Sequence, residues 1–122
     1  MILVDTSVWI DHLHQHNADL AACLHRNDVI THPMIVGELA LGSLARRQEV
    51  LALLGNLPSA ARASDQEVLV FIAADSLWSR GLSLIDAHLL AATRVMPGTR
   101  LWTHDKRLLA AAIDIGLSVR AK

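Results

Sequence analysis

Four carboxylates stand where a short apolar run passes into a turn or a helix: Asp5, Glu38, Asp86 and Asp105. Asp5 and Asp105 follow strand-like runs, so both are predicted at the edge of a sheet where its strands end. Open α/β sheets bind their ligands at that carboxyl edge. Several carboxylates gathered there stay ionised together only when a cation joins them, because like charges raise each other's pKa. The four acids therefore predict a divalent-metal site, and a site of this kind suggests phosphodiester hydrolysis.

The ligand types indicate which metal such a site would take. Carboxylate oxygens without a cysteine cluster favour Mg²⁺ or Mn²⁺ over zinc. Mg²⁺ usually keeps several waters, one of which can act as a nucleophile, and a second ion could stabilise the leaving oxygen. The hydroxyls of Thr6, Ser7 and Thr103 stand beside the acids. They are expected either to orient a water or a ligand, or to cap the helices that begin there.

Three of the four acids also have a structural alternative. Asp86 completes a Ser-x-x-Asp capping box that begins at Ser83. Asp105 could cap the helix that follows it, or pair with either of the two basic residues next to it. Asp5 could cap the first helix of the chain. Glu38 lies in an apolar helical segment, where a carboxylate without a ligand would be a strange choice.

Strand-like runs alternate with helical segments along the whole chain. Strands are predicted at 2–4, 28–31, 59–63, 100–103 and 117–119. Helices are predicted at 8–14, after the cap Asn17, and at 33–41, 44–54, 64–80, 83–95 and 105–115. Crossover helices of this length imply a parallel sheet that is covered on both faces. The predicted fold is a three-layer α/β/α domain with a central parallel sheet of four to five short strands.

Length and composition place further bounds on the protein. Its 122 residues predict a single domain over 1–122, and a 52% hydrophobic content is enough for a core without disulfides. Cys23 is the only cysteine, so no disulfide can form within the chain and a cytoplasmic location is expected. Its side chain is expected to pack inside a helix as a small apolar residue. The first residues lack the basic segment of a signal peptide. No stretch approaches the roughly 20 apolar residues that span a bilayer, so a soluble protein without a membrane partner is expected.

The charge balance restricts how nucleic acid could be bound. The net charge is −1, so a nucleic-acid partner would need a local basic patch. Arginine is the commoner basic residue, and its planar fork suits phosphate. Arg46–Arg47 and Lys106–Arg107 are candidates for such a patch, although solvated surface charge is the simpler interpretation. With three tryptophans, one phenylalanine and no tyrosine, base stacking is not expected to be the main source of affinity.

The histidines carry a weaker signal. His12, His14 and His16 invite a metal interpretation, but only the first and last of them share a helix face. Solvated histidines at a helix end are favoured there. His88 points away from Asp86 on the same helix and is expected at the surface or just behind the site.

The aromatic residues are expected to serve packing. Trp9 is predicted in the core, with a place in the groove or at a partner surface as the alternative. Phe71, Leu77 and Trp78 fall on the expected long helix, which therefore has enough apolar surface for a second copy or a partner helix.

Taken in order, these motifs resemble a PIN-domain ribonuclease. The residues that carry the resemblance are Asp5-Thr6-Ser7 after an N-terminal strand, Glu38 in a Gly-Glu-Leu helix, Asp86 in Ile-Asp-Ala-x-Leu-Ala-Ala, and Thr103-x-Asp105 after a strand. With this length and no added domain, the chain most resembles a VapC-type toxin of a bacterial toxin–antitoxin pair. The resemblance covers essentially the whole chain.

The resemblance implies roles for these residues. The metal-binding acids would be Asp5, Glu38, Asp86 and Asp105, with Thr6 or Ser7 and Thr103 assisting. The resemblance further implies hydrolytic cleavage of RNA with Mg²⁺ or Mn²⁺ and a homodimer. It also implies a cognate antitoxin that is held against the active-site groove. His104 lies at a position where members of the family vary.

Three other functions are compatible with parts of the sequence. A phosphoryl-receiver signalling module would usually need an acidic pair after the first strand, where this chain has Asp5 followed by Thr6. A non-catalytic interaction partner with the same fold would not need all four acids. A DNase acting on flapped structures usually carries extra helical segments, which 122 residues cannot hold.

Overall fold

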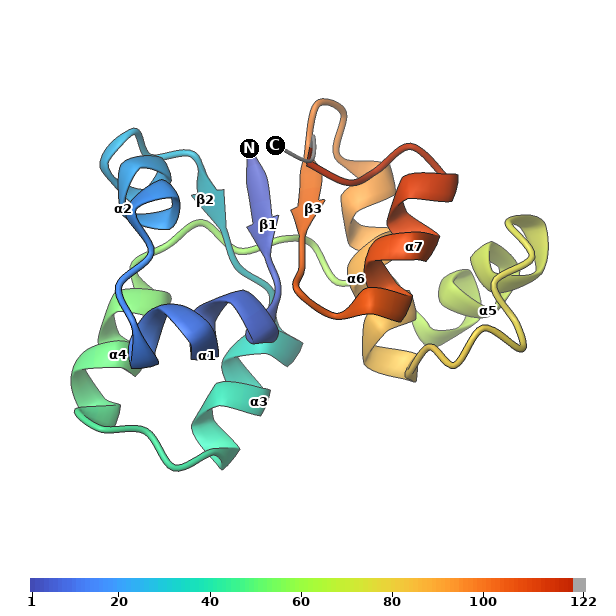
Figure 1. Cartoon of the computed structure of the whole chain (residues 1–122). Coiled ribbons are helices and arrows are strands. Elements are labelled where there is room, and N and C mark those ends of the chain that lie inside the picture. Colours follow the sequence, from blue (N-terminus) through green and yellow to red (C-terminus); the bar gives the residue numbers. More distant parts are fainter. Residues whose placement is uncertain (120–122) are drawn as a thin grey trace.

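A small parallel sheet forms the centre of the molecule. The computed structural model describes residues 1–119 and is drawn in Figure 1. The strands within that part are β1 (Ile2–Val4), β2 (Val29–Ile30) and β3 (Arg100–Trp102). They are parallel and lie in the order β2-β1-β3. Leu3 pairs with Ile30 on one side and with Leu101 on the other. Both faces of the sheet are covered, which explains why its strands are apolar apart from the exposed Arg100 at the start of β3.

The sheet is extended at both edges by one residue each. Thr31 bridges to Ser59, and Leu101 bridges to Ser118, both in parallel orientation. These are the outer strands that the sequence predicts at 59–63 and 117–119, reduced to single bridges. The prediction of four to five strands therefore differs slightly from the three observed. Pro58 lies at one of these edges and has no N–H to donate to a longer ladder.

Seven helices within the described residues flank the sheet. They are α1 (Thr6–His14), α2 (Ala18–His25), α3 (Pro33–Leu41), α4 (Arg47–Gly55), α5 (Asp65–Ala74), α6 (Leu84–Val95) and α7 (Lys106–Asp114). Figure 1 shows α1 to α4 on the β2 side of the molecule and α5 to α7 on the β3 side. Helix α3 packs on α1 and α4, and α6 packs on α5 and β3. The predicted three-layer α/β/α class is confirmed.

Capping residues and a proline predicted most helix starts correctly. The Asn17 side chain accepts a hydrogen bond from the Leu20 N–H at 3.0 Å, and Pro33 opens α3. Full capping boxes begin α5 at Ser64 and α6 at Ser83. Each satisfies backbone donors that a helix start would otherwise leave unpaired.

The predicted end of α5 is wrong. The capping box and the apolar spacing predict a helix to about residue 80, but α5 ends at Ala74. Ser76 takes a left-handed conformation with φ +54°, and the Leu77 N–H donates back to the Ile72 carbonyl at 3.0 Å. This is the geometry of a Schellman end, in which a residue beyond the turn packs onto the helix. Leu77 is buried, while Trp78 is exposed, so neither lies on α5.

Helix α4 also begins later than predicted. The amphipathic pattern predicts a start at residue 44, whereas α4 starts at Arg47. Arg46 has φ +55°, a left-handed conformation that cannot continue a right-handed helix. Leu44 nevertheless packs against the core from the preceding loop.

The core joins the sheet to helices on both sides. Leu3, Val4 and Leu101 are fully buried, as is Leu89 of α6. Cys23 is buried in α2, which confirms the expectation that it packs inside a helix. Among the helices of the described part, none is long and apolar enough to cross a membrane.

Candidate active site

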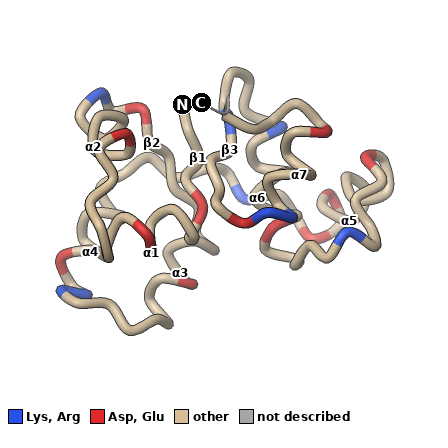
Figure 2. The backbone as a smooth tube through the Cα atoms, viewed as in Figure 1, with Lys and Arg blue, Asp and Glu red and all other residues tan. Residues whose placement is uncertain are grey.

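The four acids stand at the carboxyl edge of the sheet or on helices that begin there. Asp5 directly follows β1, and Asp105 follows β3 after two residues. Glu38 lies in α3, which follows β2, and Asp86 lies in the first turn of α6. Figure 2 shows acidic stretches near the ends of β1 and β3 and at the start of α6. Asp5 and Asp105 lie where the strand ends predicted them, and Glu38 and Asp86 are placed by the helices α3 and α6.

Asp5 is held by hydroxyl donors rather than by a helix cap. Its side chain is 6% exposed and makes no capping hydrogen bond to α1. Its Oδ2 accepts hydrogen bonds from Ser7 Oγ at 2.8 Å and from Thr103 Oγ1 at 2.7 Å. Charged acceptors of this kind need such donors when they are buried, because water is largely excluded. Ser7 therefore contacts the acid close to it in sequence, whereas Thr103 reaches from the end of β3 to the acid that follows β1.

Glu38 is tied to the first helix. Thr6 Oγ1 donates a hydrogen bond to Glu38 Oε1 at 2.7 Å, across 32 residues of sequence. Thr6 and Ser7 thus contact two different acids from neighbouring positions of α1. The alternative that they serve as the caps of α1 is wrong, because Asp5 occupies the N-cap position.

Asp86 and Asp105 each cap a helix while facing the site. Asp86 Oδ2 accepts the Ser83 N–H at 3.0 Å, and Asp105 Oδ1 accepts the Leu108 N–H at 3.0 Å. No basic side chain among the described residues forms an ion pair with either acid. The predicted capping roles of Asp86 and Asp105 are therefore confirmed, but each uses only one oxygen of the carboxylate.

The pKa of Asp86 is raised above its usual value. Burial is the largest cause, and the negative charges of Asp5 and Asp105 act in the same direction. The two hydrogen bonds with Ser83 oppose the rise without cancelling it. Asp5 and Asp105 are therefore close enough to Asp86 for their charges to act on it. Either a proton or a cation at this point would reduce that repulsion.

The donor set fits a hard divalent cation. In residues 1–119 one oxygen of each acid accepts the hydrogen bonds, and the other receives none from the protein. As the side chains stand, no three histidine, cysteine or carboxylate groups of that stretch are arranged to hold an ion together. Mg²⁺ takes carboxylate oxygens and usually keeps several waters, so the donor types suit it, but more than two of the four acids could share one ion only if their side chains moved closer together.

The sequence interpretation missed a second connection around this edge. The His104 N–H donates to Ser7 Oγ at 3.0 Å, and His104 Nδ1 lies 2.5 Å from Asp11 Oδ2. Asp11 was not singled out from the sequence. The available signal was its spacing of four residues from Ser7, which places both on one face of α1.

Comparison with known proteins identifies the family. Residues 2–114 match the PIN domain. The chain belongs to the PIN domain family. It is 45% identical over 119 residues to proteins called Ribonuclease VapC32 from two strains of Mycobacterium tuberculosis, CDC 1551 / Oshkosh and ATCC 25618 / H37Rv. The match covers 98% of this chain and 96% of each relative. The resemblance to a VapC-type PIN-domain ribonuclease is thereby confirmed, and the phosphoryl-receiver alternative is wrong.

Two buried histidines lie behind the acids of this PIN domain. His88 is fully buried, so of its two expected places the surface is wrong and a position just behind the site is left; Asp65 Oδ1 lies 3.4 Å from its Nε2. His32 is also fully buried and caps α3 by accepting the Met34 N–H at Nδ1. Burial, then the charges of His88 and Arg62, lower the pKa of His32 from 6.5 to about 4. Trp9 is buried, as predicted.

The basic residues of the two candidate patches differ in their contacts. Arg46 forms an exposed ion pair with Glu49 at 3.8 Å, and Arg47 donates to the Ala40 carbonyl. Arg47 therefore joins α4 to α3, whereas the pair of Arg46 stays within the start of α4. Lys106 and Arg107 are exposed in the first turn of α7, beside Asp105. Arg120 and Lys122 lie outside the described residues.

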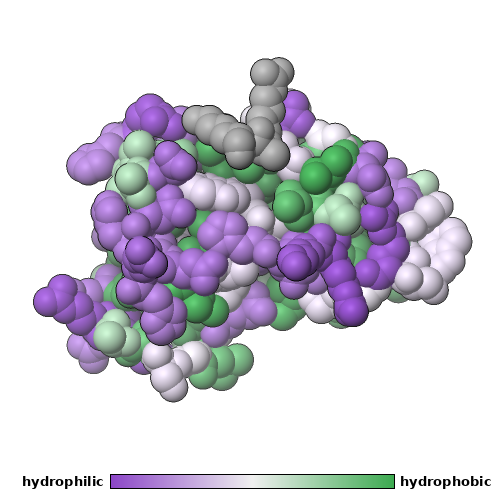
Figure 3. Space-filling model, in the orientation of Figure 1, coloured by the Kyte–Doolittle hydropathy of each residue, from purple (hydrophilic) through white to green (hydrophobic). Residues whose placement is uncertain are grey.

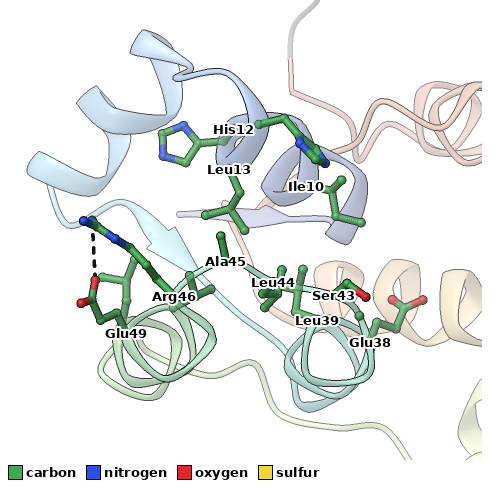
Figure 4. A pocket seen from close by; sticks show the side chains of 14 residues that line it. Ile10, His12, Leu13, Glu38, Leu39, Ser43, Leu44, Ala45, Arg46 and Glu49 are labelled. Atoms are coloured by element: carbon green, nitrogen blue, oxygen red, sulfur yellow. Dashed lines mark ion pairs between the residues drawn. The ribbon is translucent and has the colours of Figure 1, made fainter.

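A groove runs between α1, α3 and α4 and reaches one of the acids. It encloses about 740 Å³. Figure 4 shows Ile10 and Leu13 on one wall and Leu39 and Leu44 on the other, with Glu38 at one end. The surface view in Figure 3 has apolar areas near the same part of the molecule, over α3 and the segment after it.

Proposed function

We propose that this PIN domain is an endoribonuclease toxin of a toxin–antitoxin pair, which hydrolyses RNA phosphodiesters with Mg²⁺ or Mn²⁺. One observation carries the proposal: four carboxylates follow strands of the sheet or lie on helices that begin near their ends, each with an oxygen left without a protein donor in residues 1–119, and the charges of Asp5 and Asp105 act on Asp86. The name ribonuclease of the 45% identical relatives supports the same activity. We also propose that residues 1–122 form one domain that acts in the cytoplasm.

The metal-binding residues in this proposal are Asp5, Glu38, Asp86 and Asp105. A bound divalent cation would supply an acidified water for attack on phosphorus and would offset the charge that develops on the phosphate. Burial, and after it the charges of Asp5 and Asp105, raise the pKa of Asp86, and a cation at this point would offset both. Thr6, Ser7 and Thr103 orient the carboxylates through the hydrogen bonds described above.

The experiment that tests this function uses total bacterial RNA. Purified protein is incubated with the RNA in Mg²⁺, in Mn²⁺ and in EDTA, beside the Asp5→Asn variant. Discrete fragments that need the metal and disappear in the variant are expected, because the amide has only one carbonyl acceptor and no charge for a cation. Thermal unfolding of the variant serves as the control for its fold.

Full metal-dependent cleavage by Asp5→Asn would refute the assignment. No cleavage by the folded wild-type protein, freed of any copurified partner, would favour the non-catalytic alternative. Mapping the ends of the fragments would then identify the target RNA, which the site residues alone do not specify.

The groove is where we propose that the cognate antitoxin binds. Its walls carry exposed or half-exposed aliphatic side chains, including Ile10, Leu13 and Leu53. Glu38 at one end of the groove makes it continuous with the acidic site. An apolar segment from the antitoxin that fills the groove would therefore block access to the acids.

We further propose that the protein is a homodimer. Apolar side chains on and beside α5 and α6 are exposed to solvent: Leu69, Val70, Trp78, Leu84 and Val95. Exposed apolar surface of this kind usually marks an interaction site. Light scattering after size-exclusion chromatography would test the dimer, and a monomer at micromolar concentration would contradict it.

A further inference from the structure

Asp11 and His104 form a contact that links two distant parts of the active site. Asp11 lies on α1, one turn after Ser7, and His104 lies between Thr103 and Asp105. Asp11 Oδ2 is 2.5 Å from His104 Nδ1, across 93 residues of sequence. A carboxylate can only accept a hydrogen bond, so Nδ1 of His104 carries the hydrogen.

The segment 103–105 is held to α1 through Thr103, whose Oγ1 lies 3.3 Å from Ser7 Oγ, and at two points through His104. Its backbone N–H donates to Ser7 Oγ at 3.0 Å, and its ring contacts Asp11. Ser7 and Asp11 are four residues apart, so their side chains lie on the same face of the helix. His104 therefore cannot rotate or shift without breaking a contact to α1.

The residues on either side of His104 bear directly on the acids. Thr103 Oγ1 donates to Asp5 Oδ2 at 2.7 Å and accepts the Asp105 N–H at 3.0 Å. The relative position of Asp5 and Asp105 thus depends on the short segment that His104 anchors.

The exposure of the contact argues against a role in folding alone. The side chains of His104 and Asp11 are 38% and 61% exposed. Contacts between groups this exposed add little to stability, because water screens them and fixing the side chains costs entropy. Loss of the contact is therefore expected to leave the fold intact and to act only on the segment 103–105, which it joins to α1.

We propose that Asp11 and His104 are positioning residues, which hold Asp105 at the place relative to Asp5 that a divalent cation requires. This inference rests on the proposed metal-dependent function. It predicts that loss of the contact weakens metal binding and leaves RNA binding largely unchanged. Removal of groups that orient metal ligands typically lowers metal affinity by about 10- to 100-fold.

Binding of Mn²⁺ tests the proposal directly. Free Mn²⁺ is measured by electron paramagnetic resonance in titrations of wild type, His104→Ala and Asp11→Ala. We expect both variants to bind Mn²⁺ about tenfold or more weakly. The double variant should match either single variant, because all three lack the same contact. His25→Ala, an exposed histidine at the end of α2, serves as the control and should match wild type.

Two further measurements separate positioning from a structural role. His104→Asn places an amide N–H where Nδ1 lies, so it should restore most of the Mn²⁺ affinity. Cleavage by His104→Ala should recover at high Mn²⁺ with an unchanged KM for RNA. A purely structural role would instead lower the thermal unfolding temperature and reduce cleavage at every metal concentration.

The outcomes distinguish this inference from the proposed function. Wild-type Mn²⁺ affinity in His104→Ala and Asp11→Ala, in a protein that cleaves RNA, would overturn the inference alone. A wild-type protein that neither binds Mn²⁺ nor cleaves RNA would overturn the proposed function as well.

Discussion

Acid should destabilise this protein through the buried histidine His32. His32 is fully buried, and burial together with the charges of His88 and Arg62 lowers its pKa from 6.5 to about 4. In the unfolded chain the same group takes up its proton near pH 6.5. Between these two values the unfolded state binds more protons than the folded state, so stability falls as the pH falls. Above pH 6.5 His32 is neutral in both states, so its titration costs no stability. Below about pH 4 it is protonated in both states, and its effect on stability no longer changes with pH.

The size of the effect follows from the two pKa values. Each pKa unit corresponds to about 1.4 kcal/mol, so a fall from 6.5 to about 4 sets a limit of about 3 kcal/mol. Between about pH 7 and pH 5 the loss is about 2 kcal/mol. Since domains of this size have a total stability of about 5–15 kcal/mol, the loss is readily measured.

Urea unfolding of wild type and His32→Asn at several pH values provides the assay. Asparagine is a good N-cap and has no titrating group, so it keeps the role of His32 at the start of α3 while removing the proton. The variant loses packing at every pH because its side chain is smaller. It should nevertheless lack about 2 kcal/mol of the decline that wild type shows between about pH 7 and pH 5.

The comparison of slopes decides the outcome. If both proteins lost the same free energy over this range, His32 would not be the source of the acid sensitivity and the reasoning would be refuted. His25→Ala, which removes an exposed histidine, is the matched control and should keep the wild-type slope.

Three further changes have defined outcomes. Ser76→Gly should raise the free energy of unfolding by up to about 1 kcal/mol, because glycine adopts the left-handed end of α5 without strain; urea unfolding measures it, and a loss of stability would contradict it. Thr103→Val should cost about 1–3 kcal/mol in EDTA, because it leaves the buried Asp5 with one hydroxyl donor in place of two; an unchanged unfolding midpoint would contradict this. Ile10→Glu should preserve RNA cleavage and abolish its inhibition by the antitoxin, because an apolar segment in the groove would have to bury the new charge without a partner. Inhibition of the variant at the antitoxin concentration that inhibits wild type would exclude the groove as the binding site.

The parts predicted correctly from the sequence depend on short-range rules. The capping boxes at Ser64 and Ser83 and the cap at Asn17 involve residues within four positions of one another, so their signals are complete in a short window. Asp5 and Asp105 could be placed because the end of a parallel strand fixes where the next side chain lies. Residue type and local order were sufficient for these features.

The parts that were missed depend on partners far away in sequence or on uncommon backbone conformations. Ser76 ends α5 in a conformation that glycine usually takes, so the pattern gave no stop before Gly81. The burial of His88 depends on how α6 packs on its neighbours. The contact between Asp11 and His104 spans 93 residues, and neither residue type alone indicates it.

The middle strand of the sheet has a consequence for how the protein is made. Strand β1 comes first in the chain, yet one of its two neighbours is β3, and the hydrogen bond from Thr103 to Asp5 spans 98 residues. During synthesis the chain leaves the ribosome from its first residue onward, so Asp5 and Glu38 emerge long before Asp105. The acidic site can close only after most of the chain has been translated, and contacts of such long range also form slowly. The order of the strands therefore delays the appearance of the complete site until synthesis is nearly finished.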